Sequence, residues 1–71
     1  MKTVQVFQAG YPADADPHGP THWYCVGYGS TIEEAREDLT KEMQKYEAGG
    51  DAQWMREHAR YTEQSYFRRE E

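Results

Sequence analysis

Cysteine, leucine and isoleucine are nearly absent from this sequence. Cys25 is the only cysteine, so no disulfide can form within the chain, whereas small secreted domains usually depend on several. No run of apolar residues approaches the ~20 that a membrane-spanning helix needs, and the residues after Met1 lack the apolar segment of a signal peptide. We therefore expect a cytoplasmic protein without a membrane partner.

Aromatic side chains replace the missing aliphatic ones. Leu39 and Ile32 are the only residues of their kinds, but the 71 residues include six Tyr, two Trp and two Phe. This length predicts a single domain, residues 1–71, of marginal stability, for which homodimer formation is one common remedy. So small a core is not expected to hide every ring, and Tyr and Trp are enriched at the centres of protein interfaces.

Basic residues are also scarce. Eight Lys and Arg stand against 13 Asp and Glu, and the net charge is −5. The basic clusters, Arg56 with Arg60 and Arg68 with Arg69, are interleaved with glutamates. This distribution disfavours direct binding of nucleic acid. It fits either a basic protein partner or a surface whose charge only keeps the protein in solution.

Turn signals and apolar periodicity divide the chain into strands and helices. Alternating apolar residues predict two strands, and the Pro- and Gly-rich segment between them predicts a loop. Thr31 with Glu34 forms a capping box that starts a helix, with Ser30 and Glu33 as the competing register, and Gly49 ends it. An aspartate after the glycines is expected to cap a second helix. The predicted elements are a strand at 3–9, a loop at 10–20, a strand at 22–28 and helices at 32–48 and 51–69.

This ββαα order predicts an α+β fold. A small antiparallel hairpin or sheet would be packed by one long amphipathic helix and a second, C-terminal helix. The apolar stripe of the first helix recurs at the three- and four-residue spacing of a buried helix face. It consists of Ile32, Ala35, Leu39, Met43 and Tyr46.

The first predicted helix carries a dense group of acidic residues. Carboxylates in its first turns interact favourably with the helix dipole, but like-charged pairs four residues apart, such as Glu33 with Glu37 and Glu34 with Asp38, are mildly destabilising. The group is therefore either a solvated face or an acidic docking surface. The docking surface would comprise Glu33, Glu34, Glu37, Asp38 and Glu42, with Tyr11, Tyr24 and Trp54 as aromatic anchors.

No group of residues predicts catalysis or metal binding. The spacing of His18, His22 and Cys25 resembles that of zinc ligands, but glycine and proline interrupt it, and His22 and Cys25 would point to opposite faces of the predicted strand. The segment 27–30, Gly-Tyr-Gly-Ser, lacks the full spacing of a phosphate-binding loop. We predict a protein with no catalytic residues, no metal and no cofactor.

The segment Gly29–Ala35, followed by Leu39 and Met43, resembles the N-terminal domain of HicB-type antitoxins. Members of that family typically have strands followed by a Gly-x-Ser/Thr-x-Glu-Glu-Ala helix start, and the resemblance covers roughly residues 3–47. It implies a compact α+β domain that binds and blocks a small basic RNA-cleaving toxin. By size and charge, the chain is also similar to many phage-encoded anti-CRISPR proteins, which bind CRISPR effector complexes.

Both resemblances imply a non-enzymatic inhibitor that covers a basic, nucleic-acid-handling surface on a partner protein. The partner would be a CRISPR effector subunit in one case and a small ribonuclease toxin in the other, inside a bacterial cell or a phage-infected host. The acidic residues would imitate the phosphates of a nucleic acid. A structural homodimer with no other ligand is the third alternative.

Overall fold

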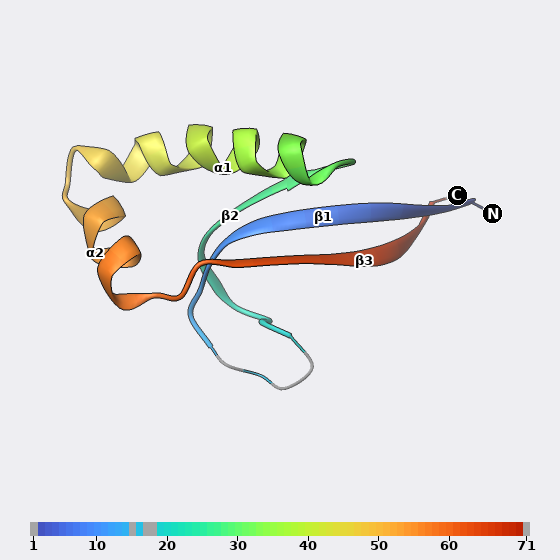
Figure 1. Cartoon of the computed structure of the whole chain (residues 1–71), viewed down its shortest axis with the longest axis horizontal. Coiled ribbons are helices and arrows are strands. Elements are labelled where there is room, and N and C mark those ends of the chain that lie inside the picture. Colours follow the sequence, from blue (N-terminus) through green and yellow to red (C-terminus); the bar gives the residue numbers. More distant parts are fainter. Residues whose placement is uncertain (1, 15, 17–18, 71) are drawn as a thin grey trace.

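The computed structural model describes residues 2–14, 16 and 19–70. Its sheet is antiparallel, with β1 in the centre and the strand order β2-β1-β3. The predicted α+β class is confirmed, and a third strand follows the second helix (Figure 1). The elements are β1 (Lys2–Pro12), β2 (Trp23–Gly29), α1 (Ile32–Glu47), α2 (Asp51–His58) and β3 (Thr62–Glu70).

The helix predicted over residues 51–69 is wrong beyond His58. Ala59 is extended, with φ −102° and ψ 142°, and the following residues form β3. The physical reason is the length of β1, because β2 pairs only with its C-terminal half, Phe7–Pro12. The rest of β1 must pair its backbone with another segment, and β3 lies beside Lys2–Gly10.

A buried polar pair fixes β3 in its place. Gln8 is 6% exposed, and its side-chain oxygen accepts a hydrogen bond from the side-chain amide of Gln64, its register partner on β3. Because β1 continues to Pro12, the loop predicted to begin at residue 10 begins later. Asp14 closes its base by accepting from the Thr21 hydroxyl (2.6 Å) and backbone N–H (3.1 Å).

The start of α1 is confirmed. The Thr31 hydroxyl accepts from the Glu34 N–H (3.2 Å), and the Glu34 carboxylate accepts from the Ser30 N–H (2.8 Å). The first bond satisfies a backbone donor that the first helical turn leaves without an intrahelical partner, and the second ties the residue before the cap to the helix. The helix ends at Glu47, one residue before the predicted end.

The core lies between α1 and the sheet, with α2 closing one end (Figure 1). Gly27 on β2 allows the helix to pack directly on the strand. A Cβ atom there would lie 2.2 Å from the Leu39 backbone nitrogen and 2.4 Å from the Ala35 carbonyl oxygen. The buried apolar residues are Ala9, Cys25, Ala35, Leu39, Met43, Ala52 and Met55.

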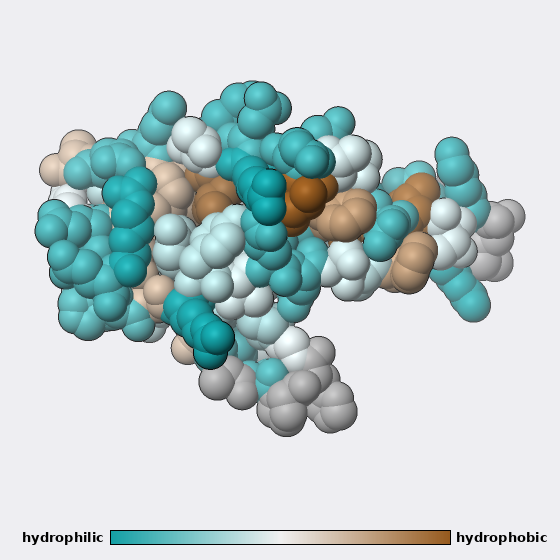
Figure 2. Space-filling view, in the orientation of Figure 1, coloured by the Kyte–Doolittle hydropathy of each residue, from teal (hydrophilic) through white to brown (hydrophobic). Residues whose placement is uncertain are grey.

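The first half of β1 and the second half of β3 form a two-stranded ribbon that projects beyond α1 and β2 (Figure 1). The molecule is accordingly elongated, with extents of 43 × 26 × 17 Å. Apolar atoms reach the surface along this ribbon between hydrophilic side chains (Figure 2). Within the described residues, no helix has the length and apolar character needed to cross a membrane.

Candidate protein-binding surface

The acidic face of α1 is the group of carboxylates predicted as a docking surface: Glu33, Glu34, Glu37, Asp38 and Glu42. The helix buries Ala35, Leu39 and Met43 against the sheet, so the carboxylates occupy the remaining circumference. Glu33, Glu34 and Glu37 are exposed, whereas Asp38 and Glu42 are half-buried. The structure therefore places all five on one helix but in two different settings.

Glu34 and Asp38 are engaged within the fold. Glu34 accepts from the Ser30 N–H at the helix start. Asp38 Oδ2 accepts from the Tyr28 N–H at 3.0 Å, which satisfies a donor on β2, a strand at the edge of the sheet. These two carboxylates support the local structure, whatever else they contact.

Glu42 forms an ion pair with Lys45, with 3.0 Å between Nζ and Oε2. This hydrogen bond and the adjacent negative charge raise the pKa of the Lys45 ammonium. The Lys45 side chain is 66% exposed and that of Glu42 36%, so water screens the pair and it contributes little to stability. Its effect is to neutralise the C-terminal end of the acidic face.

Glu33 and Glu37 are the free members of the acidic face. Within the part of the chain that the structure describes, the side chain of neither residue forms a hydrogen bond or an ion pair. The cation between them, Arg36, binds Glu63 on β3 through two hydrogen bonds of 2.6 and 3.0 Å. The first half of α1 therefore remains negative, because its Arg36 is already paired with a carboxylate of β3.

The Arg36–Glu63 ion pair joins α1 to β3. The Arg36 guanidinium, helped by the Tyr61 hydroxyl at 2.5 Å, lowers the pKa of Glu63 to about 2. The folded-state pKa is lower than the unfolded one. The pair therefore stabilises the fold at neutral pH, and its contribution is lost as the pH falls from about 4.5 through about 2.

Replacing Arg36 by glutamine is expected to raise the pKa of Glu63 from about 2 toward its ordinary value of 4.5. Glutamine keeps a hydrogen-bond donor but removes the charge and the bidentate geometry. The side-chain carboxyl ¹³C shift of Glu63, followed from pH 7 to acid, measures the change. The same titration of Glu57 serves as the control, and an unchanged Glu63 curve would contradict the role assigned to Arg36.

The predicted aromatic anchors lie in two separate places. Tyr24 and Trp54 meet edge to face, with ring centroids 5.3 Å apart, and are 44% and 45% exposed. Tyr11 is half-buried against the core, and its ring contacts Tyr61 instead, at 5.6 Å. Of the three predicted anchors, Tyr24 and Trp54 therefore form an exposed aromatic pair, and Tyr11 does not belong to it.

His58 extends this pair, and the sequence analysis missed it. Its ring stacks on Trp54 with centroids 4.8 Å apart and 13° between the planes, and its Nδ1 lies 3.0 Å from the Trp54 carbonyl oxygen. The signal was present in the sequence, because residues four apart on a helix are neighbours. Tyr24, Trp54 and His58 together form the aromatic cluster.

The residues weighed as zinc ligands do not form a cluster in the described part of the chain. Cys25 is buried, and loss of hydration raises the pKa of its thiol. It packs as a small apolar residue. His22 instead lies at the base of the loop, where its Nδ1 is 3.1 Å from Asp14 Oδ2. His18 lies outside the described residues.

The fold and these surfaces define a small α+β protein with an acidic helix face and an exposed aromatic cluster. Comparisons with protein-family models, with curated proteins and with solved structures found no match. The function is therefore argued from the surfaces themselves.

Proposed function

We propose that this chain is a non-enzymatic inhibitor that binds a partner protein and covers its basic, nucleic-acid-handling surface. The observation that carries the proposal is the free state of Glu33 and Glu37. Their neighbour Arg36 is held by Glu63, so the two carboxylates remain available to a cation from another molecule. Stability alone would favour lysine at one of these positions, four residues apart on an exposed helix.

The chemistry of recognition is that of a nucleic-acid backbone. A protein surface that binds phosphates presents Arg and Lys side chains, and carboxylates spaced along a helix can form the same charge-assisted hydrogen bonds with them. Complementary charge also accelerates association and makes it depend on salt. Glu33 and Glu37 would supply most of this electrostatic attraction. The negative charges of Glu34, Asp38 and Glu42, which already have partners within the chain, would add to it.

The aromatic cluster would supply the desolvated part of the contact. Tyr and Trp are the residues that most often carry binding energy at the centre of an interface. Tyr24 and Trp54 are nearly half exposed, and their mutual contact fixes both rings before any partner arrives. Such preorganised rings lose little conformational entropy on binding.

Two kinds of partner fit this chemistry. One is a subunit of a CRISPR effector complex, as for an anti-CRISPR protein, and the other is a small ribonuclease toxin, as for a HicB-like antitoxin. In either case the protein would act in the cytoplasm of a bacterial cell or of a phage-infected host. The proposal involves no direct contact with nucleic acid, no cofactor and no metal.

Capture from nuclease-treated bacterial lysate tests the proposal. The tagged domain is expected to retain a basic nucleic-acid-binding protein at low salt and to release it at high salt, because the screening length between exposed charges falls from about 10 Å at 0.1 M to about 3 Å at 1 M. Mass spectrometry of the eluate identifies the partner. Recovery of no protein at low salt, or only of proteins that resist high salt, would contradict an electrostatic inhibitor.

A further inference from the structure

One edge of β1 is open over its first five residues. β2 pairs with β1 only from Phe7 onward. Gly29, the partner of Phe7, is the last residue of β2, and the chain beyond it turns away into α1. Lys2–Val6 therefore has β3 on one side and, within the described part of the chain, no strand on the other. A strand edge with unpaired backbone groups is a template for another strand.

The backbone direction at this edge follows from one hydrogen bond on β2. The Tyr28 N–H points outward, to Asp38, so the backbone groups of its neighbour Gly29 point inward, to Phe7 on β1. Inward and outward groups alternate along a strand. The unpaired N–H and C=O groups at the open edge are therefore those of Thr3 and Gln5, whereas those of Val4 face β3.

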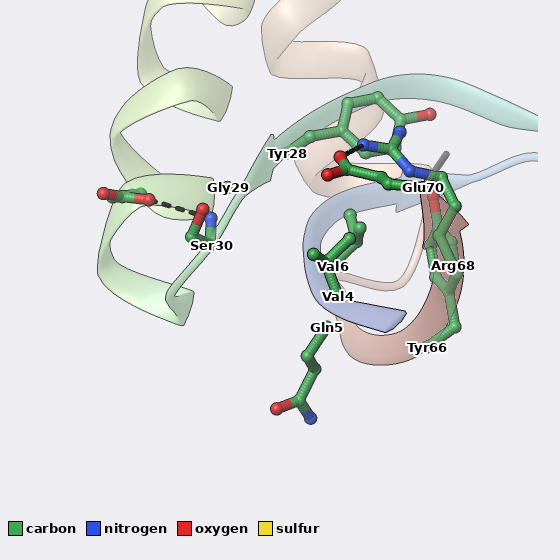
Figure 3. Close-up of a pocket in the computed structure, with 10 residues that line it drawn as sticks. Val4, Gln5, Val6, Tyr28, Gly29, Ser30, Tyr66, Arg68 and Glu70 are labelled. Carbon is green, nitrogen blue, oxygen red and sulfur yellow. Dashed lines mark hydrogen bonds and ion pairs between the residues drawn. The ribbon is translucent and has the colours of Figure 1, made fainter. Parts of the chain in front are cut away.

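A groove runs along this open edge. It is an open depression with a volume of about 670 Å³ between the projecting ribbon and the segment that leads into α1. Val4 and Val6 point into this space and Gln5 points away from it (Figure 3). The lining includes Val4, Val6, Tyr28, Glu34, Tyr66 and Arg68.

The open edge of β1 also lacks the charges that usually protect an edge strand. Its central residues, Val4 to Val6, carry no charge, and only Lys2 at its start does. On β3, the other partner in the ribbon, four of the nine residues are charged. Charged side chains on an edge strand oppose pairing with another chain. The difference singles out β1, and not β3, as the edge that accepts a strand.

We propose that this edge binds the same edge of a second copy of the chain, forming a symmetric antiparallel dimer with one continuous sheet. Thr3 would pair with Gln5 of the second copy, and Val4 would face its counterpart across the two-fold axis. This register satisfies the open backbone groups of both Thr3 and Gln5. A shift by two residues would leave one of them without a partner.

The charges of the groove fit this occupant. In the proposed register, Lys2 of the second copy lies opposite Val6, at the end of the groove lined by Tyr28 and Glu34. An ammonium group there meets a carboxylate and an aromatic ring, both of which attract cations. The valines meet valines near the axis, so no like charges face each other across the new strand pair.

The dimer contact does not depend on the proposed inhibitory function. It uses the projecting ribbon, whereas Glu33 and Glu37 lie on α1. A dimer would present two acidic faces on one particle, which strengthens binding to a partner with two sites. Loss of dimerisation alone would therefore leave the single acidic face intact, and the two proposals fail separately.

Proline at position 5 is the sharpest test. Gln5→Pro removes an N–H that faces the open edge, so it blocks strand addition and leaves the ladder with β3 intact. Arg69→Pro is the matched control, because Arg69 pairs with Thr3 from the other side and its own N–H faces solvent at the outer edge of β3. Each variant alters one edge of the same ribbon.

Sedimentation equilibrium from about 1 µM to about 1 mM measures the result. The unmodified chain and Arg69→Pro are expected to approach twice the 8.3 kDa of the monomer, and Gln5→Pro is expected to remain monomeric. Val4→Lys, which places two lysines face to face at the axis, gives an independent second variant that should also be monomeric. Amide exchange supplies the local readout, since the Thr3 N–H should become protected as the concentration rises.

Three results would overturn the proposal. One is an unmodified chain that stays monomeric throughout the range. Another is a dimer that persists in both Gln5→Pro and Val4→Lys. The third is a dimer in which the Thr3 amide exchanges as fast as in the monomer, because that contact would use another surface.

Discussion

Replacing Gly27 by alanine is expected to destabilise the domain by about 3 kcal/mol or more. The added methyl group would lie 2.2 Å from the backbone nitrogen of Leu39 and 2.4 Å from the carbonyl oxygen of Ala35. Both atoms belong to the hydrogen-bonded backbone of α1, which cannot move aside as the end of a side chain can. The helix must therefore lift from β2, which opens the core around Leu39.

Urea unfolding followed by circular dichroism measures this effect, and Gly49→Ala is the matched control. A Cβ atom at Gly49 meets only Asp51 Oδ2, at an ordinary 3.6 Å. The control is therefore expected to be neutral or slightly more stable than the unmodified chain. Equal midpoints for Gly27→Ala and the unmodified chain would contradict the close packing of α1 on β2.

Reversing the charge of Glu33 and Glu37 together is expected to weaken binding to the captured partner by at least about tenfold at low salt. The Glu33→Lys, Glu37→Lys variant replaces two free carboxylates by cations that repel a basic surface. The fold should persist, because neither side chain has a partner among the described residues, and the lost interaction of Glu33 with the helix dipole costs only about 0.3–1 kcal/mol. Calorimetry at two salt concentrations measures both the loss of affinity and the weaker salt dependence of the affinity that remains.

The control for this variant must have the same net charge. Asp51→Lys with Glu57→Lys makes the equivalent change on α2, away from the acidic face. It is expected to weaken binding far less than the α1 variant does. Equal losses for the two variants would mean that net charge, and not the acidic face of α1, drives the association. Glu34 and Asp38 are unsuitable for this comparison, because their reversal would also disturb the helix start and the edge of β2.

Local signals explain why α1 could be predicted from the sequence. The cap of Thr31 with Glu34 and the apolar stripe through Leu39 lie within one segment, so their physics needs no distant partner. Gly27 is the contrasting case. The sequence predicts a strand at this position but gives no local signal for a helix resting on it, because the contacts that require glycine come from the backbone of α1.

Long-range pairing explains why β3 could not be predicted. Positions 52, 55, 59, 62 and 66 carry Ala, Met, Ala, Thr and Tyr at the three- and four-residue spacing of a helix face, which favours a helix that continues past His58. The competing pattern, alternation along a strand, becomes favourable only because β1 offers an unpaired edge some 60 residues earlier in the chain. Such a pairing has no signature within a window of neighbouring residues.

The candidate site divides in the same way. The acidic composition of α1 could be predicted, but which carboxylates stay free could not. The Asp38 carboxylate accepts a hydrogen bond from the Tyr28 N–H, ten residues away. The Arg36 guanidinium binds Glu63, 27 residues away, and so does not pair with the carboxylates beside it on α1. Only tertiary contacts therefore distinguish Glu33 and Glu37 from the rest of the acidic face.

The central claim is that this protein and a nucleic acid compete for one basic surface. The most direct measurement repeats the capture from lysate. The bound partner is then washed, at constant salt, with its nucleic-acid ligand or with a short oligonucleotide. The account predicts that the nucleic acid releases the partner in proportion to its concentration. A partner that binds the nucleic acid while remaining attached to the domain would contradict occlusion.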